Sequence, residues 1–242
     1  MVSINPSILL EIIPGRILNH LYVYLDCAFL VLFMALLVWS RRYLTALFAL
    51  FGGIVYFLVD YGIFYLALGT RVVEGASYFW FLLWLSLSYG ITNFAWIWLW
   101  LKKDRHLLEW SLLIVLWWIA CPLIARTFGA EFGEITIYRG TAMYHGVMGI
   151  MLIVGYGFIL IHNITLKDKT KRIDILWLLA IGIIVQLGWE AALAIGGIRQ
   201  GGIETLIVNS LLETNMGVPY LFFIHKAISK RKNEDLSNPV SA

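Results

Sequence analysis

Residues 20–39 read HLYVYLDCAFLVLFMALLVW, and this stretch decides the class of fold. It contains one acidic residue, Asp26, and no lysine or arginine. An α-helix of about 20 residues is about 30 Å long, which matches the hydrocarbon core of a membrane. The stretch therefore predicts a membrane-spanning helix, and the basic pair Arg41 and Arg42 follows close behind it.

The whole chain has the composition of a membrane protein. Its 242 residues are 61% hydrophobic and 14% charged, unlike a soluble domain. Barrel strands would be about half as long as its apolar runs and would alternate in polarity. We therefore expect an all-α membrane protein, with seven transmembrane helices in one domain (residues 1–227) and a disordered cytoplasmic tail (residues 228–242). The seven apolar runs cover residues 20–39, 44–68, 77–101, 110–127, 141–162, 174–197 and 205–225.

The basic residues predict how the helices are oriented. Thirteen of the 18 lysines and arginines lie at one set of helix ends, and five lie at the other. Because cytoplasmic loops are enriched in lysine and arginine, the N-terminus is expected outside and the C-terminus in the cytoplasm. We expect a multi-pass integral protein of the cytoplasmic membrane or the endoplasmic reticulum.

Two stretches of the chain resemble each other faintly. Residues 60–75 read DYGIFYLALGTRVVEG, and residues 190–204 read EAALAIGGIRQGGIE. Each has an acid, an apolar stretch, an arginine and a further acid. One interpretation is a 3+1+3 parallel repeat, in which two sets of three helices enclose a cavity. The other is that two hairpins of equal length are alike by chance.

Four predicted helices carry a carboxylate at a similar depth. Each acid lies about 6–8 residues from the outer end of its helix, or about 9–12 Å deep. A charge at this depth is costly, so these acids are expected to face the bundle interior. Arg139 and Arg199, near the outer ends, could reach one or two of them. The acids are Asp26, Asp60, Glu190 and Glu213, and His145 lies slightly nearer the surface.

Such a layer of acids allows two interpretations. Crowded carboxylates in a dry site disfavour one another's charge, so at least one is expected to keep its proton near neutral pH. A protonated carboxyl can donate a proton, and an ionised neighbour can accept one. Alternatively, each acid accepts hydrogen bonds from a neighbouring helix and holds the helices together.

Aromatic and amide side chains lie close to the acids in the sequence. Aromatic faces can stabilise a cation, which makes these residues candidates for a substrate-binding wall. The alternative is that they pack between helices or anchor them at the membrane interface. The candidates are Trp189, Tyr61, Tyr65, Tyr89, Asn93, Trp96, Asn215 and Tyr220, together with Asp26 and His145.

The chain resembles the small integral membrane terpene cyclases of meroterpenoid and indole-diterpene pathways, in length, in seven predicted helices and in two motifs. YFLVDYGIFY (residues 56–65) places Asp60 in the second helix, where the family has an essential acid. LLETNMGVPYLFF (residues 211–223) places Glu213 in the seventh, with a similar acid-x-x-x-Gly-x-x-Tyr pattern. The family usually has Asn-x-x-Trp-Glu in the second helix and Asp in the seventh.

The resemblance implies acid–base cyclisation of a lipophilic isoprenoid without a metal or other cofactor. Asp60 and Glu213 would be the acid and base, with Glu190 as an alternative proton donor. The substrate and membrane lipid are then the expected partners, and the net charge of +3 does not suggest nucleic acid. Two other functions stay open, a small 3+1+3 transporter and a seven-helix receptor or interaction protein. A polar path to the cytoplasmic face would favour the transporter.

Overall fold

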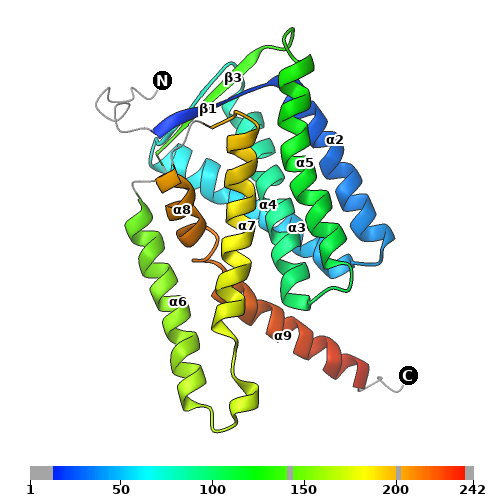
Figure 1. Cartoon of the computed structure of the whole chain (residues 1–242), viewed down its shortest axis with the longest axis vertical. Coiled ribbons are helices and arrows are strands. Elements are labelled where there is room, and N and C mark those ends of the chain that lie inside the picture. The colour runs from blue at the N-terminus through cyan, green and yellow to red at the C-terminus, as the bar shows by residue number, and fades with distance from the viewer. Residues whose placement is uncertain (1–12, 141–143, 200–202, 238–242) are drawn as a thin grey trace.

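The computed structural model describes residues 13–140, 144–199 and 203–237, and it is mostly helical. Long helices lie side by side along the long axis of the molecule, and a small β-sheet covers one end of them (Figure 1). We call this end the sheet end. It holds the first described residues, whereas the last helix, α9, lies at the opposite end.

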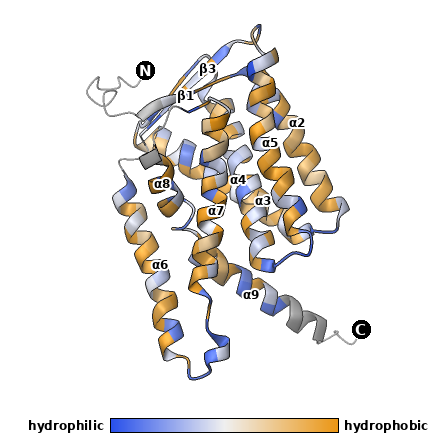
Figure 2. Cartoon of the chain, viewed as in Figure 1, coloured by the Kyte–Doolittle hydropathy of each residue, from blue (hydrophilic) through white to orange (hydrophobic). Residues whose placement is uncertain are grey.

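Six of the seven predicted runs form helices long and apolar enough to cross a membrane, as expected for a multi-pass membrane protein. Their surfaces are dominated by apolar residues, and polar residues gather at the connections (Figure 2). The six are α2 (His20–Trp39), α3 (Tyr43–Phe57) with its π-helical continuation η1 (Leu58–Ala67), α4 (Tyr78–Lys102), α5 (Leu107–Phe128), α6 (His145–Thr165), and α7 (Ile175–Ile195) with the preceding 3-10 turn η3 (Lys169–Lys171).

Helix α4 forms the centre of the bundle. In its most apolar window 78% of residues are buried, against 17% for α6. Helix α3 packs tightly on it because glycines meet at the crossing. A Cβ atom added at Gly90 would lie 2.5 Å from the Cα of Gly53. Small residues thus let the two backbones approach closely, as is common between membrane helices.

The seventh predicted run, residues 205–225, is not one continuous helix. Helix α8 (Ile203–Leu212) ends before a turn at residues 213–217, and α9 (Val218–Ser237) begins after it. Pro219 has no backbone N–H and is tolerated in the first turn of a helix but not in its interior, so it fits a helix start here. The sequence-based expectation of an unbroken helix was therefore wrong, and Glu213 lies at the break.

The prediction of a purely helical chain was also wrong. Strands β1 (Ile13–Asn19), β3 (Glu134–Arg139) and β2 (Arg71–Glu74) form an antiparallel sheet in that order. Its short segments alternate buried and more exposed residues, as in Arg71–Glu74, and the search for long apolar runs missed them.

Two other expectations concern the end opposite the sheet. Helix α9 continues to Ser237, past residue 227, where the tail was predicted to begin. Residues 238–242 lie outside the described range, so disorder there stays a prediction.

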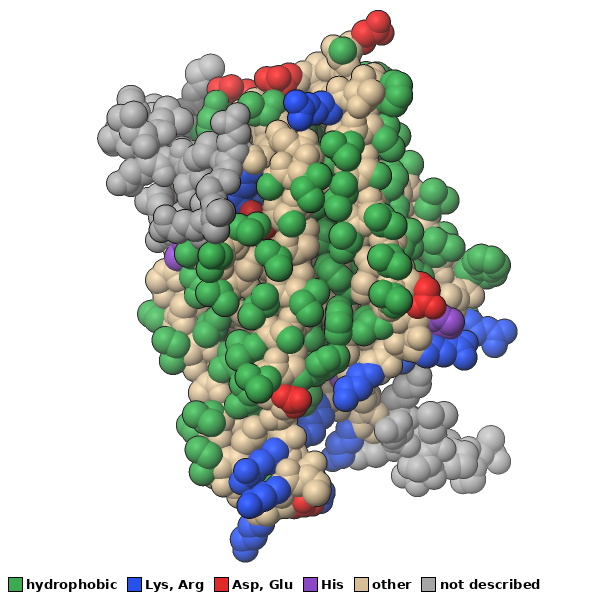
Figure 3. All heavy atoms as spheres, in the orientation of Figure 1, with side chains coloured by type: hydrophobic (Ala, Val, Ile, Leu, Met, Phe, Trp, Pro, Cys, Tyr) green, Lys and Arg blue, Asp and Glu red, His purple; other side chains and the backbone are tan. Residues whose placement is uncertain are grey.

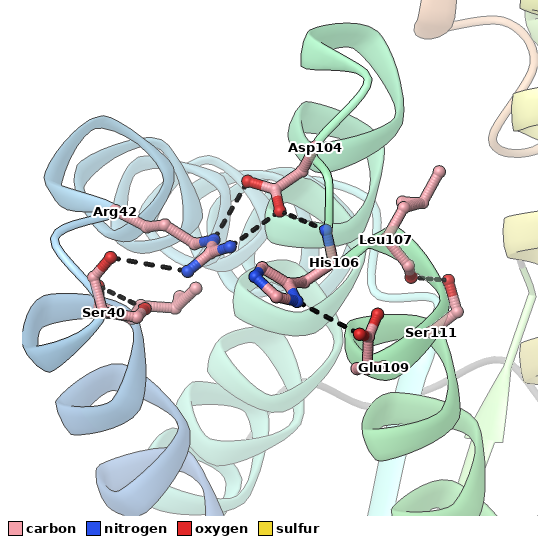
Figure 4. Close-up of polar contacts among 8 residues, drawn as sticks. Ser40, Arg42, Asp104, His106, Leu107, Glu109 and Ser111 are labelled. Carbon is pink, nitrogen blue, oxygen red and sulfur yellow. Dashed lines mark hydrogen bonds and ion pairs between the residues drawn. The ribbon is translucent and has the colours of Figure 1, made fainter.

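The connections at the end opposite the sheet are tied together by an ion pair (Figure 4). Arg42, before α3, donates from Nε and Nη2 to the Asp104 carboxylate at 3.0 and 2.7 Å. Asp104 also accepts from the backbone N–H of His106, before α5. Burial opposes the negative charge of Asp104, but the hydrogen bonds from Arg42 and His106 outweigh it and lower the pKa of Asp104.

We predict that Asp104→Asn lowers the Tm by about 2–4 °C at pH 7, the effect of about 1 kcal/mol in a protein of this size. Because the pKa of Asp104 is lower in the folded state, the ion pair stabilises the protein at neutral pH. This stabilisation is lost as the pH falls below about 4, so the Tm difference should shrink there. Thermal unfolding in detergent at pH 7 and pH 3.5 measures both effects.

Glu109→Gln is the matched control, because it removes the exposed partner of His106 in the same region (Figure 4). It should leave the Tm nearly unchanged. An equal loss in both variants would contradict a specific role for the Asp104 ion pair.

Candidate functional site

Two of the four predicted acids form ion pairs with arginines at the sheet end, and a third lies close enough to interact with these arginines electrostatically. Asp60 comes from η1, Glu190 from α7 and Glu213 from the turn between α8 and α9. We call this group, with its four arginines, the charged layer. The arginines are Arg16 on β1, Arg71 on β2, Arg139 on β3 and Arg199 after α7.

Asp60 is held by two arginines of the sheet. Its Oδ1 accepts hydrogen bonds from Arg71 Nε at 2.8 Å and from Arg139 Nη2 at 3.2 Å. Asp60 and Arg71 are buried, and the Arg71 guanidinium also lies 4.3 Å from the centre of the Phe64 ring. Asp60 lies in a π-helical segment, a helix type often found at functional sites.

Glu190 is bound by the arginine that follows its own helix. Arg199 Nη1 donates to both carboxylate oxygens of Glu190, at 2.8 and 2.6 Å. Asn209 of α8 donates to the same carboxylate at 3.0 Å. As expected from the sequence, Arg139 and Arg199 thus each reach one acid.

Gln186 connects the acids to the rest of the bundle. Its amide nitrogen donates to Glu213 at 2.8 Å and to Glu190 at 3.3 Å. Its oxygen accepts from the hydroxyls of Tyr89 at 2.7 Å and Thr214 at 2.6 Å. Gln186 is fully buried, so this neutral side chain joins α4, α7 and the helix break.

The arginines of the charged layer lie close enough to influence one another. Burial and the nearby Arg139 guanidinium lower the pKa of both Arg16 and Arg71 to about 10. Burial also opposes the charge of Arg139, but the Asp60 and Glu213 carboxylates outweigh it and raise the pKa of Arg139. All three stay positively charged at neutral pH.

Aromatic rings extend from the charged layer toward the middle of the bundle. Trp189 lies next to Glu190 and contacts the rings of Tyr89 and Trp118, each at 5.1 Å between centroids. Trp118 in turn contacts Trp96 at 5.6 Å. Three predicted wall residues, Trp189, Tyr89 and Trp96, therefore belong to one aromatic chain. Asn93 is buried beside it and donates to the Tyr89 carbonyl at 2.8 Å.

Asp26 is held separately. Its carboxylate accepts from the indole N–H groups of Trp84 at 3.1 Å and Trp117 at 3.0 Å, and it forms no ion pair with a described residue. Asp26 is buried among α2, α4 and α5. This arrangement fits the interpretation of an acid that holds helices together.

Other predicted residues pack elsewhere. The Tyr61 ring stacks on Phe57, and the Tyr65 ring on Tyr78. His145 is half-buried at the start of α6 and forms no hydrogen bond or ion pair with the described residues.

The helix break separates Tyr220 from Glu213. Tyr220 was expected on the same helical face as Glu213, but its hydroxyl donates to the Met151 carbonyl of α6 at 2.9 Å. Asn215 is fully buried in the break and accepts from the hydroxyl of Tyr156, also on α6. Both side chains thus connect the α8–α9 segment to α6.

Sequence reasoning did not select Arg16, Arg71, Gln186 or Thr214. Gln186 precedes Glu190 by four residues, so a helix places both on one face. A single glutamine inside an apolar run was therefore a usable signal. The two arginines lie on strands β1 and β2, which the pattern of long apolar runs does not predict. Among the described residues no group of His, Cys, Asp and Glu could hold a metal ion.

We predict that Gln186→Leu lowers the Tm by at least about 5 °C. The substitution leaves the buried hydroxyls of Tyr89 and Thr214 without their acceptor, and each lost partner costs about 1–3 kcal/mol. Thermal unfolding in detergent measures the loss. Leu187→Ala is the control, because Leu187 is the next residue but is 40% exposed. An unchanged Tm in Gln186→Leu would show that this network does not support the fold.

Comparison of the chain with family models, with curated proteins and with solved structures finds no match.

Proposed function

We propose that the protein is a membrane-embedded terpene cyclase that uses the charged layer as its active site. The observation that carries the proposal is the meeting of Asp60, Glu190 and Glu213 at one end of an apolar bundle, beside a chain of aromatic rings. Carboxyl groups can give and take the protons, and aromatic faces can stabilise carbocations. The substrate would be a lipophilic isoprenoid that carries an epoxide or a terminal alkene.

The contacts suggest a different role for each acid. Asp60 is bound by two guanidinium groups, which suits a fixed carboxylate. Glu213 forms no ion pair with a described residue and accepts a hydrogen bond from the neutral Gln186. We therefore assign Glu213 as the proton donor and Asp60 as the final acceptor, with Glu190 as the alternative donor.

In this mechanism Glu213 transfers a proton to the epoxide oxygen, and the carbon–oxygen bond breaks. The carbocation is attacked by alkene electron pairs within the same chain, which closes the rings. The last cation loses a proton from a neighbouring carbon to Asp60, and a proton returns from Asp60 to Glu213 through solvent. The product is an isomer of the substrate, so the atoms balance without an oxidant or reductant.

The packing below the charged layer favours an enzyme over a carrier. Trp98 and Leu99 of α4 are buried, as are Leu178 and Ile181 of α7. A carrier needs a polar route to both faces of the membrane. These apolar side chains pack in the half of the bundle away from the sheet. A cavity of about 450 Å³ at that end, lined by Leu178, Lys103 and Asp174 among others, includes no residue of the charged layer, which suits a site reached from one side or from the lipid.

We predict that purified protein or membranes containing it convert an epoxidised prenyl substrate into an isomer of unchanged mass. Asp60→Asn and Glu213→Gln should each lower the rate by about 100-fold or more, the usual contribution of a general acid or base. Product analysis by mass spectrometry measures the conversion.

Asp26→Asn is the matched control, because Asp26 lies in its own tryptophan pocket and should retain most of the activity. Each variant is assayed at a temperature at which its thermal unfolding curve shows it to be folded, because Asp60→Asn also weakens the contact with Arg71 and Arg139. No isomer from a panel of epoxidised and unmodified isoprenoids would refute the proposal, and uptake assays would then test the carrier.

We also propose that α8, the turn and α9 together form a seventh, broken transmembrane span. The sheet end would then lie outside and the C-terminus in the cytoplasm. Lysine and arginine side chains gather at the end opposite the sheet (Figure 3), in agreement with the positive-inside rule. Helix α5 contacts both α2 and α7, as a linking helix in a 3+1+3 arrangement would.

We predict that cysteines placed at Glu131 and at Lys171 label from opposite sides of the membrane. Glu131 follows α5 at the sheet end, and Lys171 precedes α7 at the other end. The background would carry Cys27→Ser and Cys121→Ser. In intact cells a membrane-impermeant maleimide should label position 131, and position 171 should react only after permeabilisation. The reverse pattern would contradict the orientation.

A further inference from the structure

The sheet places two pairs of arginines directly opposite each other. Arg71 on β2 is paired with Arg139 on β3, and Arg16 on β1 forms an isolated antiparallel bridge with Arg199. Opposite residues on antiparallel strands point to the same face, with about 5 Å between their Cβ atoms. Like charges at such positions repel each other, so each pair needs a negative partner.

The first pair has this partner inside the protein. A single oxygen of Asp60 accepts a hydrogen bond from both Arg71 and Arg139. Both guanidinium groups are thereby drawn to one carboxylate, which compensates for their mutual repulsion.

The second pair is only half neutralised. Glu190 directs both oxygens to Arg199, at 2.8 and 2.6 Å. Arg16 forms no ion pair with a described residue, although only 8% of it is exposed. Its guanidinium lies 5.8 Å from the centre of the Trp189 ring. Glu190 and Glu213 attract this charge from beyond ion-pair distance. Burial therefore removes its hydration, and no carboxylate of a described residue contacts it directly.

The charges of the layer leave a positive excess among the described residues. Four guanidinium groups face Asp60, Glu190 and Glu213, so the excess is one positive charge when all three acids are ionised and two when Glu213 carries the proton that it would donate. In addition, Nε of Arg139 is buried without a hydrogen-bond partner. The layer thus has the donors and the charge to accept one more anion.

A cavity of about 550 Å³ with a mixed polar and apolar lining lies near this second pair. Ile17 and Ile198, the chain neighbours of Arg16 and Arg199, line it together with Tyr22, Arg126 and Glu134. Arg16 and Arg199 themselves are not part of its lining, so a ligand in the cavity would have to reach past the strand to meet them. Its volume is typical of small-molecule sites.

We propose that Arg16 and Arg199 bind an anionic head group, a phosphate monoester or a carboxylate, on the isoprenoid substrate. The inference rests on the proposed function for the isoprenoid part of the ligand. The anion would lie beside Arg16 and Arg199, as the Asp60 carboxylate lies between Arg71 and Arg139. Guanidinium groups bind phosphate and carboxylate oxygens well because each offers paired N–H donors.

Binding of three probes with the same hydrocarbon chain tests the proposal: farnesyl phosphate, farnesoic acid and farnesol. Titration calorimetry in one detergent would give each Kd without any turnover. At least one anionic probe should bind wild-type protein at least tenfold more tightly than the neutral alcohol, and the tighter of the two anions identifies the head group. Equal affinity for all three would overturn the proposal.

Arg16→Gln should reduce this anion preference to less than threefold and leave farnesol binding unchanged. Arg105→Gln is the matched control, because it removes the same charge from an exposed position at the other end of the bundle. The site would be contradicted if Arg16→Gln kept the wild-type preference for the anionic probe. It would also be contradicted if Arg105→Gln lost this preference to the same extent. If Arg16→Gln does not fold, Arg16→Lys is measured in its place and should show a reduced preference for the anionic probe. A preference as large as that of the wild type would contradict the site.

The two proposals can fail separately. Tight binding of an anionic probe without any cyclised product would support the anion site and refute the cyclase. Cyclisation of a neutral epoxide with no anion preference would support the cyclase and refute the anion site.

Discussion

The ion pair between Asp60 and the arginines of the sheet is the interaction on which the sheet end depends. It joins η1 and the nearby strand β2 to β3, which lies far from both in the chain. Arg71 is fully buried, and removing either partner would leave an uncompensated charge in an apolar surrounding. The contact therefore fixes the position of β3, and β3 pairs with β1, which carries Arg16. The geometry of the whole charged layer follows from this one carboxylate.

The break between α8 and α9 gives Glu213 its surroundings. In a continuous helix its neighbours would be residues three and four positions away. Glu213 keeps its neighbour on the N-terminal side, because its backbone N–H donates to the Asn209 carbonyl at 2.9 Å. The turn that begins here places Thr214 against Gln186 and Asn215 against Tyr156. Asn215 also fills the space above Gly182, where a Cβ atom would lie 2.1 Å from its side-chain oxygen. Helix breaks inside membrane bundles are tolerated where protein side chains satisfy the freed backbone, and they often form binding sites.

The sequence was sufficient to predict the membrane-spanning helices but not the structures at the ends of the helices. Long apolar runs predict spanning helices because length and hydropathy are local properties, and six of them were confirmed. The strands and the break were missed because they depend on contacts between segments far apart in the chain. Asp26 illustrates the same limit. It shares its depth with Asp60, but the indoles of Trp84 and Trp117 hold it in another part of the bundle. The position of a residue within its apolar run predicts its depth in the membrane, whereas packing decides which acids meet.

An excess of positive charge is a problem for carbocation chemistry, because it would repel the cation that the proposed reaction forms. An anionic head group on the substrate would remove this excess before the chemistry begins. It would also hold the chain at one end, so that the developing cation lies away from the guanidinium groups and near the rings of Trp118 and Trp96. Binding and catalysis would then rely on the same electrostatic balance. The buried arginines destabilise the sheet end of the free protein. Their electrostatic energy would become favourable once the substrate supplies the missing negative charge.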